Sequence, residues 1–200
     1  MRRLFSASLF LVLLMALSPL PAQADSFIVL SPGTITIPEG VSFSMELSIS
    51  GLGLFMAPSL GAWDLDVLFD SSILGFTGAT FGDPILGDQL DLFGLGSITG
   101  VDNSLPGVLN LFQLSLDFPI DLDTLQADSF VLATLDFDAI GVGSSALTIN
   151  LNALSDADGF PLVAGAGGAN ATVTPEPATL LLLASGLGAL GAWRRKRKLR

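Results

Sequence analysis

The segment at residues 62–76 reads Ala62-Trp-Asp-Leu-Asp-Val-Leu-Phe-Asp70-Ser-Ser-Ile-Leu74-Gly-Phe76. In it, Trp63, Leu65, Val67 and Phe69 alternate with Asp64, Asp66, Leu68 and Asp70. Successive side chains of a strand point to opposite faces, so the alternation predicts a β-strand with one buried face and then a turn. We expect Trp63 in the core, and Asp64 and Asp66 on the solvent face.

The same period of two recurs on both sides of this stretch, between clusters of Gly, Pro, Asp and Asn. The apolar sets are Val41, Phe43, Met45, Leu47 and Ile49; Phe112, Leu114 and Leu116, alternating with Gln113, Ser115 and Asp117; Val131, Ala133, Leu135 and Phe137; and Leu147, Ile149 and Leu151. The pattern predicts an all-β antiparallel β-sandwich of about eight or nine strands, each sheet burying one face. No segment before the tail keeps a helical period.

Two stretches resemble the cohesin family. Phe69 and Asp70 match the aromatic-Asp pair that ends the family's second strand, and Leu74 matches the Leu after its turn. Leu147-Thr-Ile-Asn-Leu-Asn-Ala-Leu-Ser-Asp156-Ala-Asp158-Gly159-Phe-Pro-Leu162 resembles its late strand and Asp-x-Asp-Gly turn. The resemblance covers roughly residues 27–170. It implies a cohesin-like jelly roll, a fold shared with carbohydrate-binding modules, and hence a protein or carbohydrate partner.

Charge is distributed very unevenly along the chain. All 8 Lys and Arg residues lie at the two ends, whereas Asp25 to Thr174 holds 18 of the 19 acids and has a formal charge of −18. So acidic a segment repels phosphate backbones, which excludes nucleic-acid binding by this part. The chain has no Cys, so no disulfide supports the fold.

The N-terminal residues 1–24 are typical of a secretory signal peptide. Met-Arg-Arg is followed by an apolar run from Leu9 to Leu17 and by Ala22-Gln-Ala24. A charged start, a short apolar run and an Ala-x-Ala site predict cleavage by signal peptidase between Ala24 and Asp25.

The C-terminal end has three parts. A linker at 171–177 contains Pro175, Glu176 and Pro177; an apolar segment at 178–193 is predicted to form a single transmembrane helix; and a basic tail occupies 194–200. The tail should stay cytoplasmic and stop transfer through Arg194, Arg195, Lys196, Arg197 and Lys198.

This order of features resembles the PEP-CTERM sorting signal of exopolysaccharide-producing Gram-negative bacteria. The resemblance implies that an exosortase, a transpeptidase of the membrane, processes the chain near Pro175-Glu-Pro177. The inner membrane would then be a transient location, and the cell surface or extracellular matrix the destination.

Missing residue types restrict the chemistry of the middle. Asp25 to Thr174 contains no His, Cys, Lys, Arg or Tyr. Ser–His–Asp, thiol and Schiff-base catalysis are therefore excluded there, as are zinc sites built on His or Cys. A carboxylate pair from Asp64, Asp66 and Asp70 could still support glycoside hydrolysis. We expect that the protein is not an enzyme. The alternative is a secreted, carboxylate-based glycan hydrolase that acts on matrix polysaccharide.

Calcium is the one cofactor that the acids suggest. Asp156 and Asp158 offer hard oxygen ligands on a turn, and Asn150 and Asn152 could add ligands from the adjoining strand. A plain Asp/Gly turn, in which Asp accepts hydrogen bonds from local N–H groups, is the favoured interpretation because the ligand set is incomplete.

Taken together, these patterns predict a sandwich domain at 25–170 with a structural or adhesive role.

Overall fold

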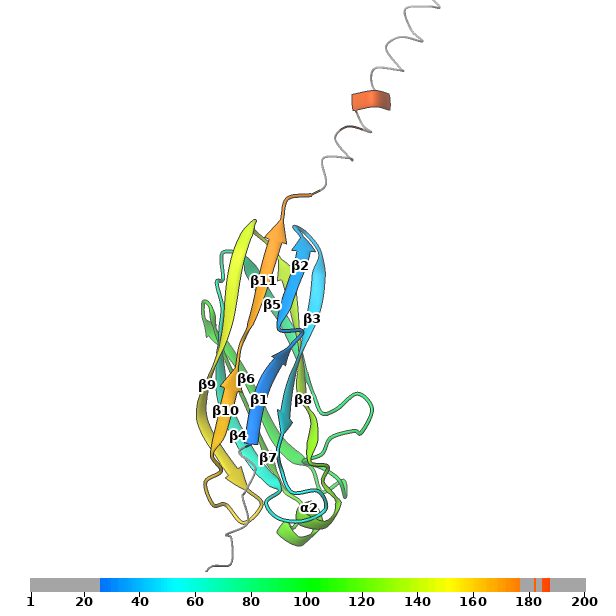
Figure 1. Cartoon of the computed structure of the whole chain (residues 1–200), viewed down its shortest axis with the longest axis vertical. Coiled ribbons are helices and arrows are strands. Elements are labelled where there is room, and N and C mark those ends of the chain that lie inside the picture. Colours follow the sequence, from blue (N-terminus) through cyan, green and yellow to red (C-terminus); the bar gives the residue numbers. More distant parts are fainter. Residues whose placement is uncertain (1–25, 177–181, 183–184, 188–200) are drawn as a thin grey trace, which may run out of the picture.

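Two antiparallel-rich sheets pack face to face in the computed structural model (Figure 1). The structure describes residues 26–176, 182 and 185–187. One sheet has five strands in the order β10-β1-β3-β8-β5, and the other has six in the order β2-β11-β9-β4-β7-β6. The elements are β1 Ser26–Ser31, β2 Thr34–Pro38, β3 Ser42–Ser50, β4 Leu60–Leu68, β5 Leu74–Phe81, β6 Ser97–Leu105, β7 Val108–Ser115, α2 Pro119–Leu125, β8 Ser129–Ala139, β9 Gly143–Asp156, β10 Ala164–Gly167 and β11 Ala169–Thr174. The predicted all-β sandwich is confirmed.

The first and last strands each change sheets halfway. β1 and β10 pair in parallel in the five-stranded sheet, whereas β2 and β11 pair in parallel in the six-stranded one. The second change of sheet occurs at Gly168, where a Cβ would collide with the carbonyl oxygen of Leu147. The two changes of sheet are why the strands number eleven and not eight or nine.

The predicted alternation fills the core. Trp63, Leu65 and Val67 of β4 are buried, with Trp63 only 2% exposed, as expected. Phe137 of β8 lies at the centre of an aromatic cluster, with ring centroids 5.3 to 5.8 Å from those of Phe43, Phe69 and Phe76. Aromatic pairs at such separations add to the stabilisation from burial alone. Val41 lies outside β3 and is exposed, so that strand begins one residue later than its pattern suggested.

The orientation predicted for β7 is wrong. Leu109, Leu111 and Gln113 face the core, and Phe112, Leu114 and Leu116 face solvent. The strand starts at Val108, and Leu109 and Leu111 fill the interior. Because the side-chain period is two, this choice turns the next apolar set outward.

A short helix and one domain boundary also differ from the prediction. Residues Pro119–Leu125 form α2, a helix of 7 residues that is too short to show a helical period and starts at a proline. Residues 171–174 belong to β11 and not to a linker, because Ala171 and Val173 are buried between the sheets. The folded domain therefore extends to Thr174.

The two ends of the folded domain lie far apart. The start of β1 lies near the end of the sandwich that carries α2, and β11 ends at the opposite end, from which the chain continues (Figure 1). Leu182 and Ser185 to Leu187 are helical. Within the described residues no helix has the length and apolarity needed to span a bilayer. The rest of the predicted helix at 178–193 lies outside them.

Candidate interaction face and sorting junction

The outer face of the six-stranded sheet carries a polar cluster. Asp64 and Asp66 of β4 lie opposite Phe112 and Asn110 of β7. The Asn110 amide Nδ2 donates to Asp64 Oδ1 at 2.7 Å and to Asp66 Oδ1 at 2.9 Å. Asn152 of β9 also donates to Asp64 Oδ1, at 3.1 Å. The two acids thus lie on the solvent face, where the alternation placed them, and amides link them to the neighbouring strands.

An apolar cluster adjoins these acids on the same face. Leu114 of β7 lies directly opposite Ile98 of β6, and Phe112 lies opposite Gly100. Directly opposed residues of an antiparallel pair share a face, so these side chains point outward together. Ile98 is 50% exposed, Leu114 44%, Leu116 49% and Phe112 36%. We call these four side chains, together with Asp64, Asp66 and Asn110, the outer patch.

Gly100 shapes the apolar part of the outer patch. A Cβ at this position would collide with the ring of Phe112. The ring therefore lies across the backbone of β6, which spreads apolar surface over two strands. Such cross-strand covering of a glycine by an aromatic ring also helps to set the register of a sheet.

The loop between β5 and β6 explains why Gln113 can face inward. Its amide Nε2 donates to Asp88 Oδ2 at 2.8 Å and to Ser97 Oγ at 3.0 Å. Burying an amide is costly unless it is hydrogen-bonded. Asp88 and Ser97 supply partners for Nε2, whereas Oε1 is buried without a hydrogen-bond partner among the described residues. Sequence reasoning missed Ile98 and Asn110. The one available signal was that Leu109 and Leu111 continue the alternation on the face of Gln113.

Asp70 lies at the turn after β4, apart from the outer patch. The Ser72 hydroxyl donates to Asp70 Oδ1 at 2.6 Å and the Ser72 N–H at 2.9 Å. These hydrogen bonds hold the pKa of Asp70 below its ordinary value, and the one from the Ser72 hydroxyl has the larger effect. The general acid of a glycosidase needs a raised pKa, so Asp70 is tuned in the opposite direction.

The residues suggested for calcium are divided between two places. Asp156 Oδ1 accepts the Phe160 N–H at 2.7 Å, and the Asp156 carbonyl accepts the Gly159 N–H at 3.1 Å, as in an ordinary Asp/Gly turn. Asp158 is exposed in the same turn. Asn150 lies opposite Asp66 on β9, and Asn152 donates to Asp64, which places both on the strand. The described residues contain no group of three acidic, His or Cys side chains suited to a metal ion.

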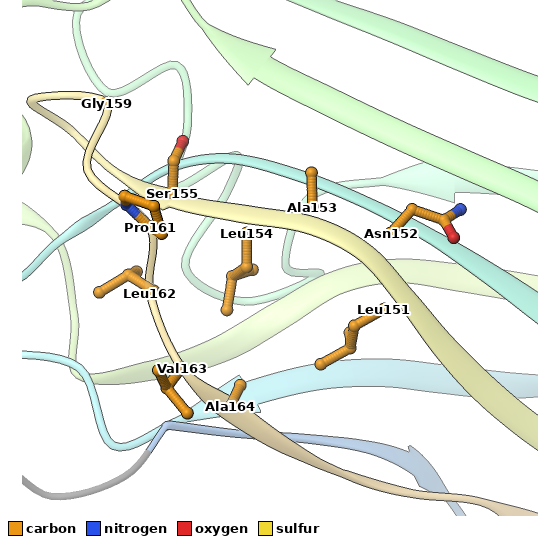
Figure 2. A pocket seen from close by; sticks show the side chains of 10 residues that line it. All are labelled: Leu151, Asn152, Ala153, Leu154, Ser155, Gly159, Pro161, Leu162, Val163 and Ala164. Carbon is orange, nitrogen blue, oxygen red and sulfur yellow. The ribbon is translucent and has the colours of Figure 1, made fainter.

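An open groove of about 590 Å³ lies between β9 and the segment leading into β10 (Figure 2). Leu151 and Leu154 point from β9 toward Leu162 and Ala164, whereas Asn152 points away from that segment (Figure 2). The groove forms because β10 pairs with β1 in the other sheet, and not with β9. Its lining carries no acid, so it offers no carboxylate pair for hydrolysis.

The proposed sorting site begins where the last strand ends. Val173 is 2% exposed, and the next residue, Thr174, ends β11. Pro175 and Glu176 follow at once and are exposed. Pro177 lies outside the described residues, as do Ala22, Ala24 and Asp25 of the signal-peptide prediction and the basic residues Arg194 to Lys198.

Comparisons with known proteins bear on both parts of the chain. Residues 173–197 match the PEP-CTERM protein-sorting motif. No curated protein matches the sequence.

Solved structures resemble the sandwich. CaCohA2 from Clostridium acetobutylicum is 21% identical, with a TM-score of 0.56 over 76% of this chain and 92% of that one. The sixth cohesin of scaffoldin B from Acetivibrio cellulolyticus, solved with a dockerin, is 17% identical, with a TM-score of 0.58 over 75% and 99%. A non-cellulosomal cohesin from the archaeon Archaeoglobus fulgidus is 13% identical, with a TM-score of 0.55 over 76% and 92%. At these identities the likeness establishes the fold. The chain thus joins a cohesin-like β-sandwich to a PEP-CTERM signal for export and sorting to the cell envelope.

Proposed function

We propose that this chain is a non-catalytic interaction module of the cell envelope, which binds a partner protein through the outer patch. An exosortase sorts it through the motif at 173–197. The observation that carries the proposal is the outward orientation of Phe112, Leu114 and Leu116, which the sheet leaves exposed beside Ile98. Contiguous apolar surface rimmed by polar groups is typical of protein-binding sites.

The chemistry of the partner follows from the patch. Its apolar centre requires an apolar surface that excludes water, and Asp64 and Asp66 at its edge favour Arg or Lys on the partner. The dockerin bound by the Acetivibrio cohesin shows that a sandwich of this fold can serve such a role in another protein. The destination we propose is the surface or exopolysaccharide matrix of a Gram-negative bacterium.

Carbohydrate binding is a weaker candidate for this face. Sugar rings stack on flat exposed aromatics, and Phe112 is the aromatic residue in the patch. Hydrolysis of matrix glycans by Asp64, Asp66 and Asp70 is weaker still, because the pKa of Asp70 is lowered. Turnover of the host's own exopolysaccharide that disappears in Asp66→Asn would establish the hydrolase instead.

The test compares two exposed aromatics on opposite faces. Phe27 lies on the outer face of the other sheet, is 44% exposed, and its ring also covers glycines, Gly165 and Gly167. The double variant Phe112→Ala/Leu114→Ala and the control Phe27→Ala would be used to capture proteins from the host's envelope fraction. We expect the patch variant alone to lose a partner that binds the wild type. That partner, once identified and purified, should bind the wild type at least tenfold more tightly than the patch variant. Equal binding by all three proteins would refute the proposed site.

A further inference from the structure

The sorting motif begins inside the folded sandwich. The match starts at Val173, which lies between Ile37 of β2 and Gly143 of β9 and is only 2% exposed. Thr174 lies opposite Pro38, and its carbonyl oxygen accepts the Glu39 N–H at 2.8 Å. The residues immediately before Pro175 therefore have their main-chain groups and side chains committed to the fold.

Proteins that bind an extended peptide commonly do so through the peptide's main-chain hydrogen-bonding groups. On the N-terminal side of the tripeptide no free spacer separates β11 from Pro175. Proline has no N–H to donate, so Pro175 itself offers an enzyme only its carbonyl. An enzyme cleft that holds even two residues before the tripeptide must take them from β11.

We infer that processing at Pro175-Glu-Pro177 requires the end of β11 to separate from β2 and β9, so that the folded domain restrains its own processing. This rests on the proposed sorting. Whichever bond is cut, the acyl group on the domain side passes to water or to an acceptor amine, and the tail leaves with a free amino group. Opening exposes the buried Val173 side chain, and this cost makes the open state about ten- to a hundredfold less populated than it would be without it. The processing rate falls by the same factor.

The test inserts Gly-Ser-Gly-Ser between Thr174 and Pro175 of the full chain, in a host that encodes an exosortase. The insertion supplies free residues before the tripeptide and leaves β11 intact. The control places the same four residues between Gly94 and Leu95, both exposed in the β5–β6 loop. Pulse-chase labelling and mass measurement of the shortened product give the rates. We expect tail removal about tenfold faster with the junction insertion, and the wild-type rate with the control.

A second pair of variants tests the same step without added residues. Ile37→Ala truncates the β2 side chain opposite Val173, and Ile49→Ala truncates another buried isoleucine, toward the far end of β3. When the two variants are compared at an equal loss in the free energy of unfolding, Ile37→Ala should speed processing and Ile49→Ala should not.

The outcomes separate the two claims. Equal rates for the wild type and the junction insertion would overturn the restraint while leaving the sorting intact. Failure of every variant to lose its tail, or the same loss in a host without the exosortase, would overturn the proposed sorting and the restraint with it.

Discussion

Gln113 lies on the buried face of β7, in line with Leu109 and Leu111. It is 1% exposed, and its amide group bonds Asp88 and Ser97, which tie the β5–β6 loop to the sheet. Turning the strand over would bury Phe112 and Leu114, but it would break the hydrogen bonds from Gln113 to Asp88 and Ser97. A single buried, hydrogen-bonded side chain thus helps to expose the outer patch.

Replacing Gln113 should therefore cost much more stability than replacing its apolar neighbour. We expect Gln113→Ala to lower the free energy of unfolding by about 1–3 kcal/mol, because Asp88 loses a donor and a buried space is left. Leu114→Ala, which truncates an exposed side chain, should cost less than about 1 kcal/mol. Urea denaturation measures both, and equal losses would show that Gln113 does not anchor the strand.

We expect Asp83 to make the free energy of unfolding depend on pH. Its partial burial raises the pKa, but hydrogen bonds from the backbone N–H groups of Leu86, Val131 and Ile85 outweigh that effect and hold the pKa below the ordinary value of 3.8. A carboxylate with a lowered folded-state pKa stabilises the fold fully above its unfolded pKa. It loses that contribution as pH falls through the folded value.

We therefore expect the difference in urea midpoint between the wild type and Asp83→Asn to shrink as pH drops below about 4. Asp158→Asn, an exposed acid in the β9–β10 turn, is the control and should keep the wild-type slope. A slope for Asp83→Asn equal to that of the wild type would refute this role for Asp83.

At the scale of elements, two glutamines fasten the α2 end of the sandwich. Gln126, just after α2, is 1% exposed; its Oε1 accepts the Leu60 N–H at 2.6 Å, and its Nε2 donates to the carbonyls of Leu60 and Gln89 at 3.0 and 2.9 Å. Gln89 Oε1 in turn accepts the Ala127 N–H at 3.0 Å. The start of β4, the β5–β6 loop and α2 are thus held together by side chains that substitute for strand pairing.

Loss of this contact should loosen three segments at once. We expect Gln126→Ala to cost about 2–4 kcal/mol, because it leaves buried main-chain groups of Leu60 and Gln89 without partners. Thr124→Ala, on the exposed side of α2, should stay within about 0.5 kcal/mol of the wild type. Amide exchange should quicken at Leu60 and Ala127 in Gln126→Ala. Unchanged exchange there would show that Gln126 does not hold these segments together.

The main feature of the whole molecule is the negative charge of its folded domain. Asp25 to Thr174 has a formal charge of −18 with no cation among its side chains. Such a domain repels itself, so salt should stabilise it by screening. The same field favours a partner with basic residues at the edge of the outer patch.

Calcium should act here through its charge and not through a dedicated site. Asp156 already accepts the Phe160 N–H, and Asn152 serves Asp64. We expect calcium and magnesium at the same millimolar concentration to raise the Tm equally over a chelator control. A larger rise with calcium that Asp156→Asn abolishes would instead establish a calcium site at the turn.

Much of this protein follows from its sequence alone. The alternation from Trp63 to Phe69 led to the buried strand β4 and to the sandwich, because a period of two is a local property of extended backbone. The same alternation placed Asp64 and Asp66 outside. The order of Pro-Glu-Pro, apolar segment and basic tail indicated sorting, since such a signal is read as linear sequence.

Other features depend on contacts between segments that lie far apart in the sequence. Phe112, Leu114 and Leu116 point outward because Leu109, Leu111 and Gln113 face the core. Asp88 of a distant loop accepts a hydrogen bond from the Gln113 amide nitrogen there, and no pattern within 112–117 records that contact. Likewise, residues 171–174 belong to the folded domain because β2 and β9 lie on both sides of Val173. Burial is set by what covers a side chain. The alternation of residues determines that a strand has two faces, and the packing of remote segments determines which of them the protein presents to a partner.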